Sequence, residues 1–318
     1  MNKKVGLGVA GVVVLLILLI RFEPTRVVWG TLTGEAFYEG RPSSHWATQL
    51  AGGPTEHSEA VRSLQGGGTA GVDVLIELLG SERGGQASVV SRTAVEILSE
   101  LGPEANKAGD ALIAALGESD LHLPSIAARA LPKVDTPAEK AIPALTPLLQ
   151  SKHSIAASRA ISEYHGQAKS VIPELIAVLR DESLETEVRW NAARTLGKVG
   201  PDGLEALPTL IEFTTNSEDT IREHAAEAIG DIGPTAVEGI PALIECLDDP
   251  YTRVRRDAVR SLGYMGEAAR ETVPQVKKLL DDSEELVRDA AKNALKAIAP
   301  EELPQDDDKP AKTPKAGP

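Results

Sequence analysis

A 33-residue internal repeat in the C-terminal half of this 318-residue chain restricts it to a few architectures. The arginine near the start of the repeated motif recurs at intervals of 33 residues. The segments that align are EVRWNAARTLGKVGP from Glu187, TIREHAAEAIGDIGP from Thr220, RVRRDAVRSLGYMGE from Arg253 and LVRDAAKNALKAIAP from Leu286. Repeats of this period indicate stacked supersecondary units, none of which buries its apolar face alone.

A second apolar stretch precedes each of these segments and begins near a proline. The four dipeptides are Ile172-Pro173, Leu207-Pro208, Ile240-Pro241 and Val273-Pro274. Proline in the first helical turn sacrifices no hydrogen bond. The unit is therefore helix A, a short turn and helix B, ended by Gly-Pro. Weaker openings at Val72, Gly109 and Ile142, and a first pair around Trp46 and Leu64, extend the pattern to about eight pairs.

Helix B carries an apolar stripe with i, i+4, i+8 spacing, which places its members on one helical face. The stripe consists of Val188, Ala192 and Leu196, then Ile221, Ala225 and Ile229, then Val254, Ala258 and Leu262, then Val287, Ala291 and Leu295. Neighbouring pairs must stack to bury it. The sequence predicts an all-α fold, an α-solenoid that forms a right-handed superhelix.

These motifs resemble the HEAT repeat, particularly the bacterial HEAT-like repeats of the phycobilisome lyase type. The shared features are Val-Arg at the start of helix B, the following Ala-Ala, the L-G-x-x-G-P ending and an acidic residue six positions before the arginine. The resemblance covers about 250 residues and implies a structural ladder between repeats. The ladder residues would be Arg189, Arg222, Asp249, Arg255, Asp282 and Arg288. Ser183 and Asn216 stand where Arg189 and Arg222 would need an acid, so this ladder is incomplete.

The first residues read as a membrane anchor. Val5 to Ile20 is uncharged and flanked by basic residues, whereas a cleavage site is absent. Gly6 to Gly11 spells G-x-G-x-x-G, but no strand precedes it as a dinucleotide site requires. The predicted order is an anchor at 1–22, a linker at 23–42, the solenoid at 43–300 and a disordered tail at 301–318. The charge bias favours a single-pass protein with its solenoid on the extracytoplasmic side and the lipid bilayer as one partner.

The charge of the chain argues against nucleic acid as a partner. The total is -14, and because residues 1–26 are net basic the remainder is more acidic still. Such a body repels phosphate backbones. The single cysteine, Cys246, lies in an apolar run and is expected to be a buried hydrophobe.

No catalytic motif emerges from the sequence. Glu223-His224 resembles the His-Glu pairs of deoxyhypusine hydroxylases in reversed order, but one such pair cannot hold two irons. Glu56-His57 is a second reversed pair about five repeats away. We therefore expect no catalytic residue, no metal, no cofactor and no small-molecule substrate. The alternative is a HEAT-like enzyme of the phycobilin lyase or deoxyhypusine hydroxylase-related (oxidoreductase) group, which stoichiometric iron would indicate.

The remaining candidate is a surface on helix B, opposite the core stripe. Its residues are Trp190, Arg194, Glu223, Glu227, Arg256 and Arg260. A tryptophan beside an arginine is typical of binding hot spots. The sequence thus predicts a scaffold or adaptor that binds other proteins through a concave helix-B surface. A solvated helix face, or an envelope spacer without a specific partner, are the alternatives.

Overall fold

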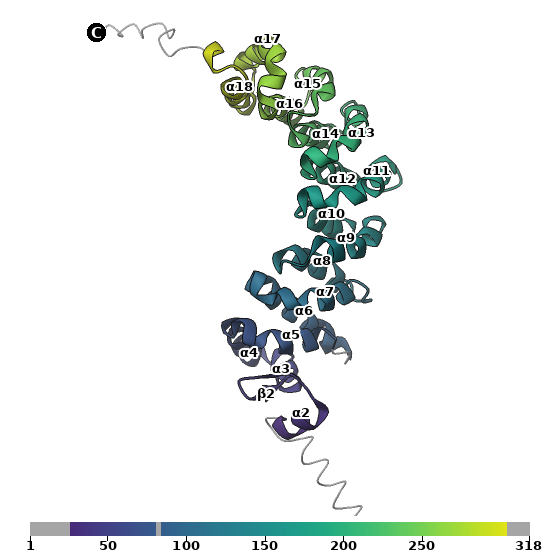
Figure 1. Cartoon of the computed structure of the whole chain (residues 1–318), viewed down its shortest axis with the longest axis vertical. Helices are drawn as coiled ribbons and strands as arrows, with labels where there is room; N and C mark the ends of the chain where they lie inside the picture. The colour runs from purple at the N-terminus through teal and green to yellow at the C-terminus, as the bar shows by residue number, and fades with distance from the viewer. Residues whose placement is uncertain (1–25, 81–83, 304–318) are drawn as a thin grey trace, which may run out of the picture. The chain divides into compact units, whose positions relative to one another are not determined.

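The computed structural model describes residues 26–80 and 84–303. The chain divides into two compact units, Met1–Ile161 and Ser162–Pro318, which are described separately below. In both units the helices follow one another in sequence order and alternate between two layers (Figure 1).

Unit 1 begins with a small non-repeat element in the region assigned as a linker. Helix α2 (Val27–Thr33) precedes a hairpin of β1 (Phe37–Tyr38) and β2 (Arg41–Pro42), in which Phe37 pairs with Pro42. The repeat helices follow: α3 (Ser43–Leu50), α4 (Pro54–Gly66), α5 (Val72–Leu79), α6 (Gly84–Leu101), α7 (Gly109–Ala115), α8 (Leu123–Lys133), α9 (Ala138–Leu145) and α10 (Ser154–Ser162).

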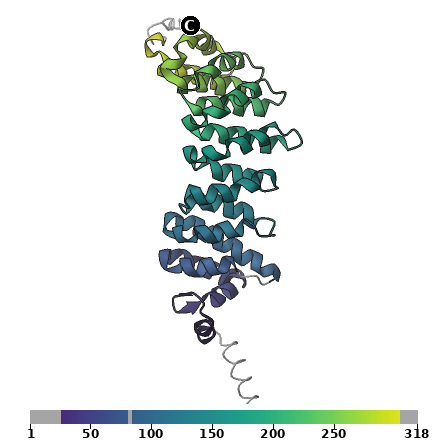
Figure 2. The ribbon, with the colours of Figure 1, turned by 45° about the vertical axis from the view of Figure 1, so that its right-hand side comes forward.

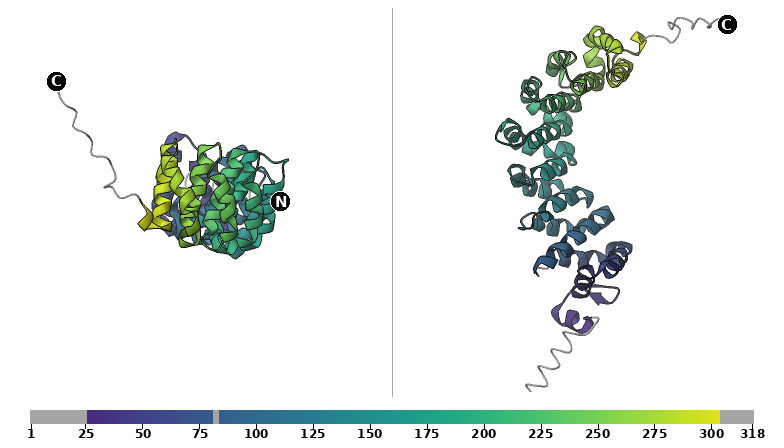
Figure 3. Two further views of the ribbon diagram at one scale, coloured as in Figure 1. Left: turned by 90° about the horizontal axis from the view of Figure 1, so that it is seen from above. Right: turned by 180° about the vertical axis from the view of Figure 1, so that it is seen from behind.

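Unit 2 continues the alternation of helix A and helix B. The A helices are α11 (Ile172–Arg180), α13 (Leu207–Phe213), α15 (Ile240–Cys246) and α17 (Val273–Lys278). The B helices are α12 (Thr186–Lys198), α14 (Asp219–Ile232), α16 (Thr252–Met265) and α18 (Glu285–Ile298). Figure 2 and the right panel of Figure 3 show the paired helices of each unit as successive layers. Short 3₁₀ turns join most of the pairs.

The helix openings match the sequence pattern with one exception. Helices α5, α7, α11, α13, α15 and α17 all begin at the first residue of the predicted dipeptide. Helix α9 instead begins at Ala138, so that Pro143 lies inside it. The cause is Pro137, which precedes Ala138 and starts the helix one turn earlier than Pro143 indicated. From α3 to α18 the described residues form eight pairs, as the repeat count predicted. The handedness of the superhelix stays a prediction.

Seven of the eight B helices are followed within three residues by a residue with positive φ, which is common where helices end. These residues are Gly68, Gly102, Asp135, His165, Gly200, Gly233 and Gly266. Asp135 and His165 show that this backbone conformation recurs after the B helices even where the residue is not glycine. The last B helix differs, because Ala299 after α18 has a φ of -156°.

The predicted core stripe is buried along all four B helices of unit 2. Every member from Ala192 onward is 0% exposed, whereas Val188, at the start of α12, is half-buried. Three glycines at equivalent positions let these helices pack closely. A Cβ on Gly197 would lie 2.5 Å from the Cα of Ala228, one on Gly230 2.6 Å from that of Ser261, and one on Gly263 2.9 Å from that of Ala294. We call Gly197, Gly230 and Gly263 the seat glycines.

Cys246 gives a test of the core of unit 2. Its side chain is 4% exposed, and burial raises the pKa of the thiol to about 11. Because the thiolate is the reactive form, native protein is expected to react with a thiol reagent such as DTNB far more slowly than protein in denaturant. The chain has one cysteine, so the absorbance change reports this site alone. Equal labelling rates with and without denaturant would contradict a buried thiol.

The predicted membrane localisation is corrected by the described helices. Crossing a bilayer takes about 20 mainly apolar residues. Among the residues that the structure describes, 26–80 and 84–303, the longest helix is α6, which has 18 residues and carries Arg92 and Glu96, and no helix there is long and apolar enough to span a membrane. The single-pass assignment, the extracytoplasmic placement and the bilayer as a partner are therefore not supported. The segment read as an anchor, 1–22, lies outside the described residues, as does the tail from 304.

Candidate protein-binding surface

Two of the four arginines of the repeat motif, Arg222 and Arg255, link successive repeats through bidentate ion pairs. Arg222 donates from Nε and Nη2 to the two oxygens of Asp249, at 2.8 and 3.1 Å. Arg255 binds Asp282 in the same way, at 2.9 Å for both contacts. The side chains are largely buried, with Arg222 11% and Asp249 9% exposed. Charge-assisted pairs with this geometry are among the strongest hydrogen bonds in proteins.

The ion pairs do not join each arginine to the acidic side chain six residues earlier, as the sequence motif predicted. Arg222, Arg255 and Arg288 each donate to the backbone carbonyl of the residue six positions earlier: Arg255 Nη1 donates to the carbonyl of Asp249 at 2.9 Å, and Arg288 to that of Asp282. The carboxylate of Asp249 instead accepts from Arg222, 27 residues earlier. A backbone acceptor needs no acid, which explains why Asn216 serves Arg222 equally well, at 2.8 Å.

The buried arginine of α12 has a different partner. Arg189 is 7% exposed, and its Nε donates to the carbonyl of Leu179 at 3.1 Å. Leu179 lies in the preceding A helix, so this arginine ties helix B to helix A within one repeat. The structure thus places all six ladder residues at junctions within or between repeats.

A second row of residues lies on the B helices opposite the core, and we call it the B-face stripe. It comprises Trp190, Arg194 and Lys198 on α12, Glu223, Glu227 and Asp231 on α14, and Arg256, Arg260 and Tyr264 on α16. The four-residue spacing keeps each group of three on one helical face. The six residues predicted for protein binding all belong to this stripe.

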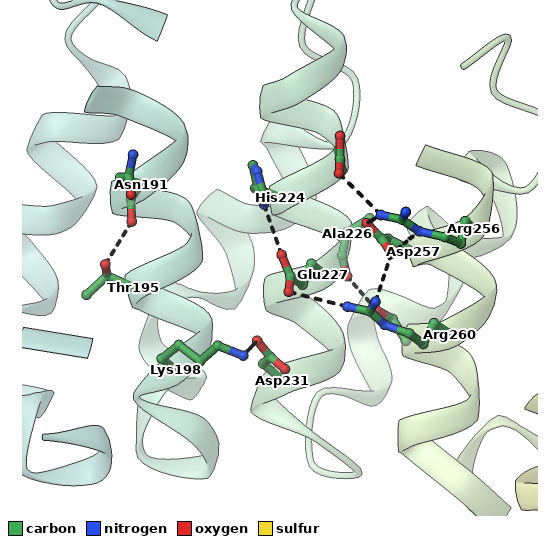
Figure 4. Close-up of polar contacts among 12 residues, drawn as sticks. Asn191, Thr195, Lys198, His224, Ala226, Glu227, Asp231, Arg256, Asp257 and Arg260 are labelled. Atoms are coloured by element: carbon green, nitrogen blue, oxygen red, sulfur yellow. Dashed lines mark hydrogen bonds and ion pairs between the residues drawn. The ribbon is translucent and has the colours of Figure 1, made fainter. Parts of the chain in front are cut away.

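The charges of the stripe are neutralised between adjacent helices. Lys198 pairs with Asp231 at 2.7 Å, Arg256 with Glu223 at 3.4 Å and Arg260 with Glu227 at 3.3 Å, each across 33 residues (Figure 4). Asp257, 2% exposed at its side chain, accepts from Arg256 at 2.7 Å. The charged residues of the predicted binding surface thus mainly pair with one another within the chain.

The surroundings of two acids of this lattice shift their pKa values in opposite directions. The hydrogen bond from His224 Nδ1, at 2.9 Å, lowers the pKa of Glu227 to about 2. Glu223 is 8% exposed, and this burial raises the pKa of its carboxyl group. Glu227 is therefore a fixed negative charge at neutral pH, held between His224 and Arg260.

Part of the stripe stays accessible at its two sides. On α12, Arg194 is exposed, and Trp190 is half-buried with its ring stacked on His224 at a centroid distance of 4.4 Å. On α16, Tyr264 is 54% exposed, and the guanidinium of Arg260 lies over its ring at 5.7 Å. Tyr264 is not among the residues predicted from the sequence, although its position four residues after Arg260 is a usable signal.

The reversed Glu-His pairs do not form a metal centre in the described structure. His224 Nδ1 donates a hydrogen bond to Glu227, and the neighbouring Glu223 forms an ion pair with Arg256. His57 Nδ1 donates to the carbonyl of Leu50 at 2.7 Å. Within residues 26–80 and 84–303, no group of three or more His, Cys, Asp or Glu side chains has the arrangement of a metal site.

Comparison with known proteins identifies the repeats. The pattern of the HEAT-repeat family matches residues 151–230, 172–262 and 240–308. No curated protein matches the sequence. Among solved structures, a homology model of the full-length AP-3 complex in an intermediate open conformation has a TM-score of 0.55 at 16% identity. The similarity covers 80% of this chain and 50% of that one, and it shows the fold alone.

Two enzyme structures are also similar, but weakly. The CpcE–CpcF complex of phycocyanin lyase from Nostoc sp. PCC7120 has 22% identity and a TM-score of 0.40, covering 48% of this chain and 97% of that one. Human deoxyhypusine hydroxylase has 17% identity and a TM-score of 0.34, covering 80% and 95%. Neither score is high enough to carry an argument about this chain. The described chain therefore has a nearly all-helical fold, and HEAT repeats are recognisable in its sequence across residues 151–308.

Proposed function

We propose that this protein is a HEAT-repeat scaffold that binds partner proteins through the B-face stripe of unit 2 and performs no catalysis. The observation that carries the proposal is the accessible Trp190 and Arg194, which stand beside a lattice of charges already paired within the chain. Tryptophan, tyrosine and arginine dominate binding hot spots. Tyr264 extends the same surface on α16.

The paired lattice supports binding through its rigidity. Side chains that are already held by ion pairs lose little conformational freedom when a partner covers them. Arg256, Arg260, Glu223 and Glu227 therefore form a pre-ordered polar floor, with their side chains between 11% and 37% exposed. The accessible aromatic rings at either side supply apolar contact area.

A matched pair of double variants tests the proposal. Trp190→Ala with Arg194→Ala is expected to weaken capture of the specific partner by about tenfold or more, because hot-spot truncations cost at least about 2 kcal/mol. The control removes an exposed apolar and an exposed basic residue elsewhere in unit 2, Leu204→Ala with Lys278→Ala. Crosslinking and quantitative mass spectrometry of full-length protein measure capture. Identical partner profiles for wild type and both variants would refute the proposal, and stoichiometric iron in purified protein would contradict the absence of catalysis.

A further inference from the structure

A hollow of about 380 Å³ lies on the B helices of unit 1. Helix α6 supplies Val89, Arg92, Thr93 and Glu96, and α8 with its preceding residue supplies His122, Ser125, Ile126 and Arg129. Both sets have i, i+3, i+4, i+7 spacing, so each is one helical face, and the two sets stand 33 residues apart. His57 of α4 closes one side.

The charge of this hollow is opposite to that of the chain. Two arginines and two histidines surround it against the single carboxylate of Glu96, in a protein whose net charge is -14. His57 donates its Nδ1 proton to a backbone carbonyl, which leaves Nε2 for another contact. Arg129 is exposed, and within the described residues it takes part in no hydrogen bond or ion pair.

Comparison with unit 2 shows why the hollow stays open. At the corresponding positions of α14 and α16, Glu223 faces Arg256 and Glu227 faces Arg260, so two ion pairs bridge the helices. In unit 1 the residue 33 positions after Arg92 is Ser125, which has no charge to offer. Ser125 instead binds His153 Nδ1 at 2.8 Å. The bridge between Glu223 and Arg256 therefore has no equivalent here, whereas Glu96 and Arg129 stand at the positions where Glu227 and Arg260 pair in unit 2.

The apolar residues at the rim of the hollow favour a peptide over a free inorganic anion as its ligand. Val89 is 40% exposed and lines the hollow beside Ile126, while Leu121, 61% exposed, directly precedes His122. An inorganic anion makes no use of such side chains, whereas a peptide does. Guanidinium groups match carboxylates in bidentate geometry. We infer that this hollow binds an acidic peptide segment of a partner protein, one that carries glutamate or aspartate together with a large apolar side chain.

The inference rests on the proposed function in that the segment belongs to a bound protein, but it uses a different surface. The probe is a fluorescein-labelled synthetic peptide, Glu-Glu-Leu-Glu-Glu-Leu, titrated with full-length protein by fluorescence anisotropy. Arg92→Ala with Arg129→Ala is expected to weaken binding about tenfold or more, since hydrogen bonds to charged groups are lost. The control Lys278→Ala removes one positive charge from an A helix and is expected to bind as wild type does.

The arms of the titration separate the possible outcomes. A peptide with glutamine in place of glutamate is expected to bind at least about tenfold more weakly. Displacement of the probe by inorganic phosphate alone would overturn the inference in favour of a simple anion site, as would equal binding by wild type and the double variant. If the double variant unfolds, Arg129→Glu, at an exposed position, repeats the test. If wild-type protein does not bind the peptide, while the Trp190 and Arg194 double variant still loses its partner protein, this inference is overturned and the proposed function is not.

Discussion

Gly230→Ala is expected to destabilise unit 2 by about 2–3 kcal/mol, the range of overpacked cores. In most helices the same change stabilises by up to about 1 kcal/mol. The sign reverses here because the added Cβ would lie 2.6 Å from the Cα of Ser261, in the backbone of α16. Backbone cannot move aside as the end of a flexible side chain does. The measurement is urea unfolding, with the exposure of Cys246 to DTNB as a second reading of the same unit.

The last repeat offers a control for Gly230 at the equivalent position. Lys296 of α18 corresponds to the seat glycines, is exposed, and has no B helix beyond it among the described residues. Lys296→Ala is expected to change stability by less than about 0.5 kcal/mol, as surface substitutions do. A Gly230→Ala protein as stable as wild type would mean that the helices separate without cost and that the close packing is not required.

Asp249→Ala is expected to cost about 3–5 kcal/mol, the penalty for leaving a buried charge without its partner. Arg222, 11% exposed, would keep only its backbone acceptors, the carbonyls of Asn216 and Ser217. Thermal unfolding measures the loss. Lys140→Ala breaks a pair with Asp110 whose side chains are 53% and 75% exposed, and is expected to cost less than about 1 kcal/mol. Equal effects of the two substitutions would contradict a special role for the buried ladder.

The same ladder predicts a loss of stability in acid. Burial opposes ionisation of Asp249, but the hydrogen bonds from Arg222 and from the backbone of Tyr251 outweigh it, and the folded-state pKa is lowered. A lowered pKa gives stability that is complete above the unfolded value of about 3.9 and is lost as the pH falls below it. Glu227 acts likewise down to about pH 2. Asp249→Ala is expected to unfold with a shallower dependence on pH below about 4 than wild type.

The helices and core of unit 2 follow from the sequence because each repeat restates the same local rules. Proline fixes where helix A begins, and the i, i+4, i+8 stripe fixes which face of helix B is buried. The rules fail where two signals compete, as at α9, where Pro137 outweighs Pro143. They also miss the stops at Asp135 and His165, because a search for glycine overlooks other residues that adopt positive φ.

The sequence shows which residues lie on the B-face stripe but not that most of their charges are paired. A single helix shows Arg256 and Arg260 as solvent-facing, since the partners Glu223 and Glu227 lie 33 residues earlier on a neighbouring helix. Only the register between repeats reveals the pairs. The residue type of Trp190 is enough to indicate a binding site from the sequence. Its stacking on His224 depends on tertiary structure and cannot be read from the sequence.

Because the seat glycines recur every 33 residues, the packing between B helices is compatible with adding or removing whole repeats. Each seat, from Gly197 to Gly263, accommodates the helix that follows it, and Lys296 fills the equivalent place at the end of the series. A duplicated 33-residue segment inserted before the final repeat would therefore meet a suitable neighbour on both sides. A lysine at this position has a long side chain where the seat glycines have none, so a further helix would not pack there at the same close distance. One residue position, glycine in three repeats and lysine in the last described one, thus distinguishes a repeat with a closely packed successor from the one at the end of the series.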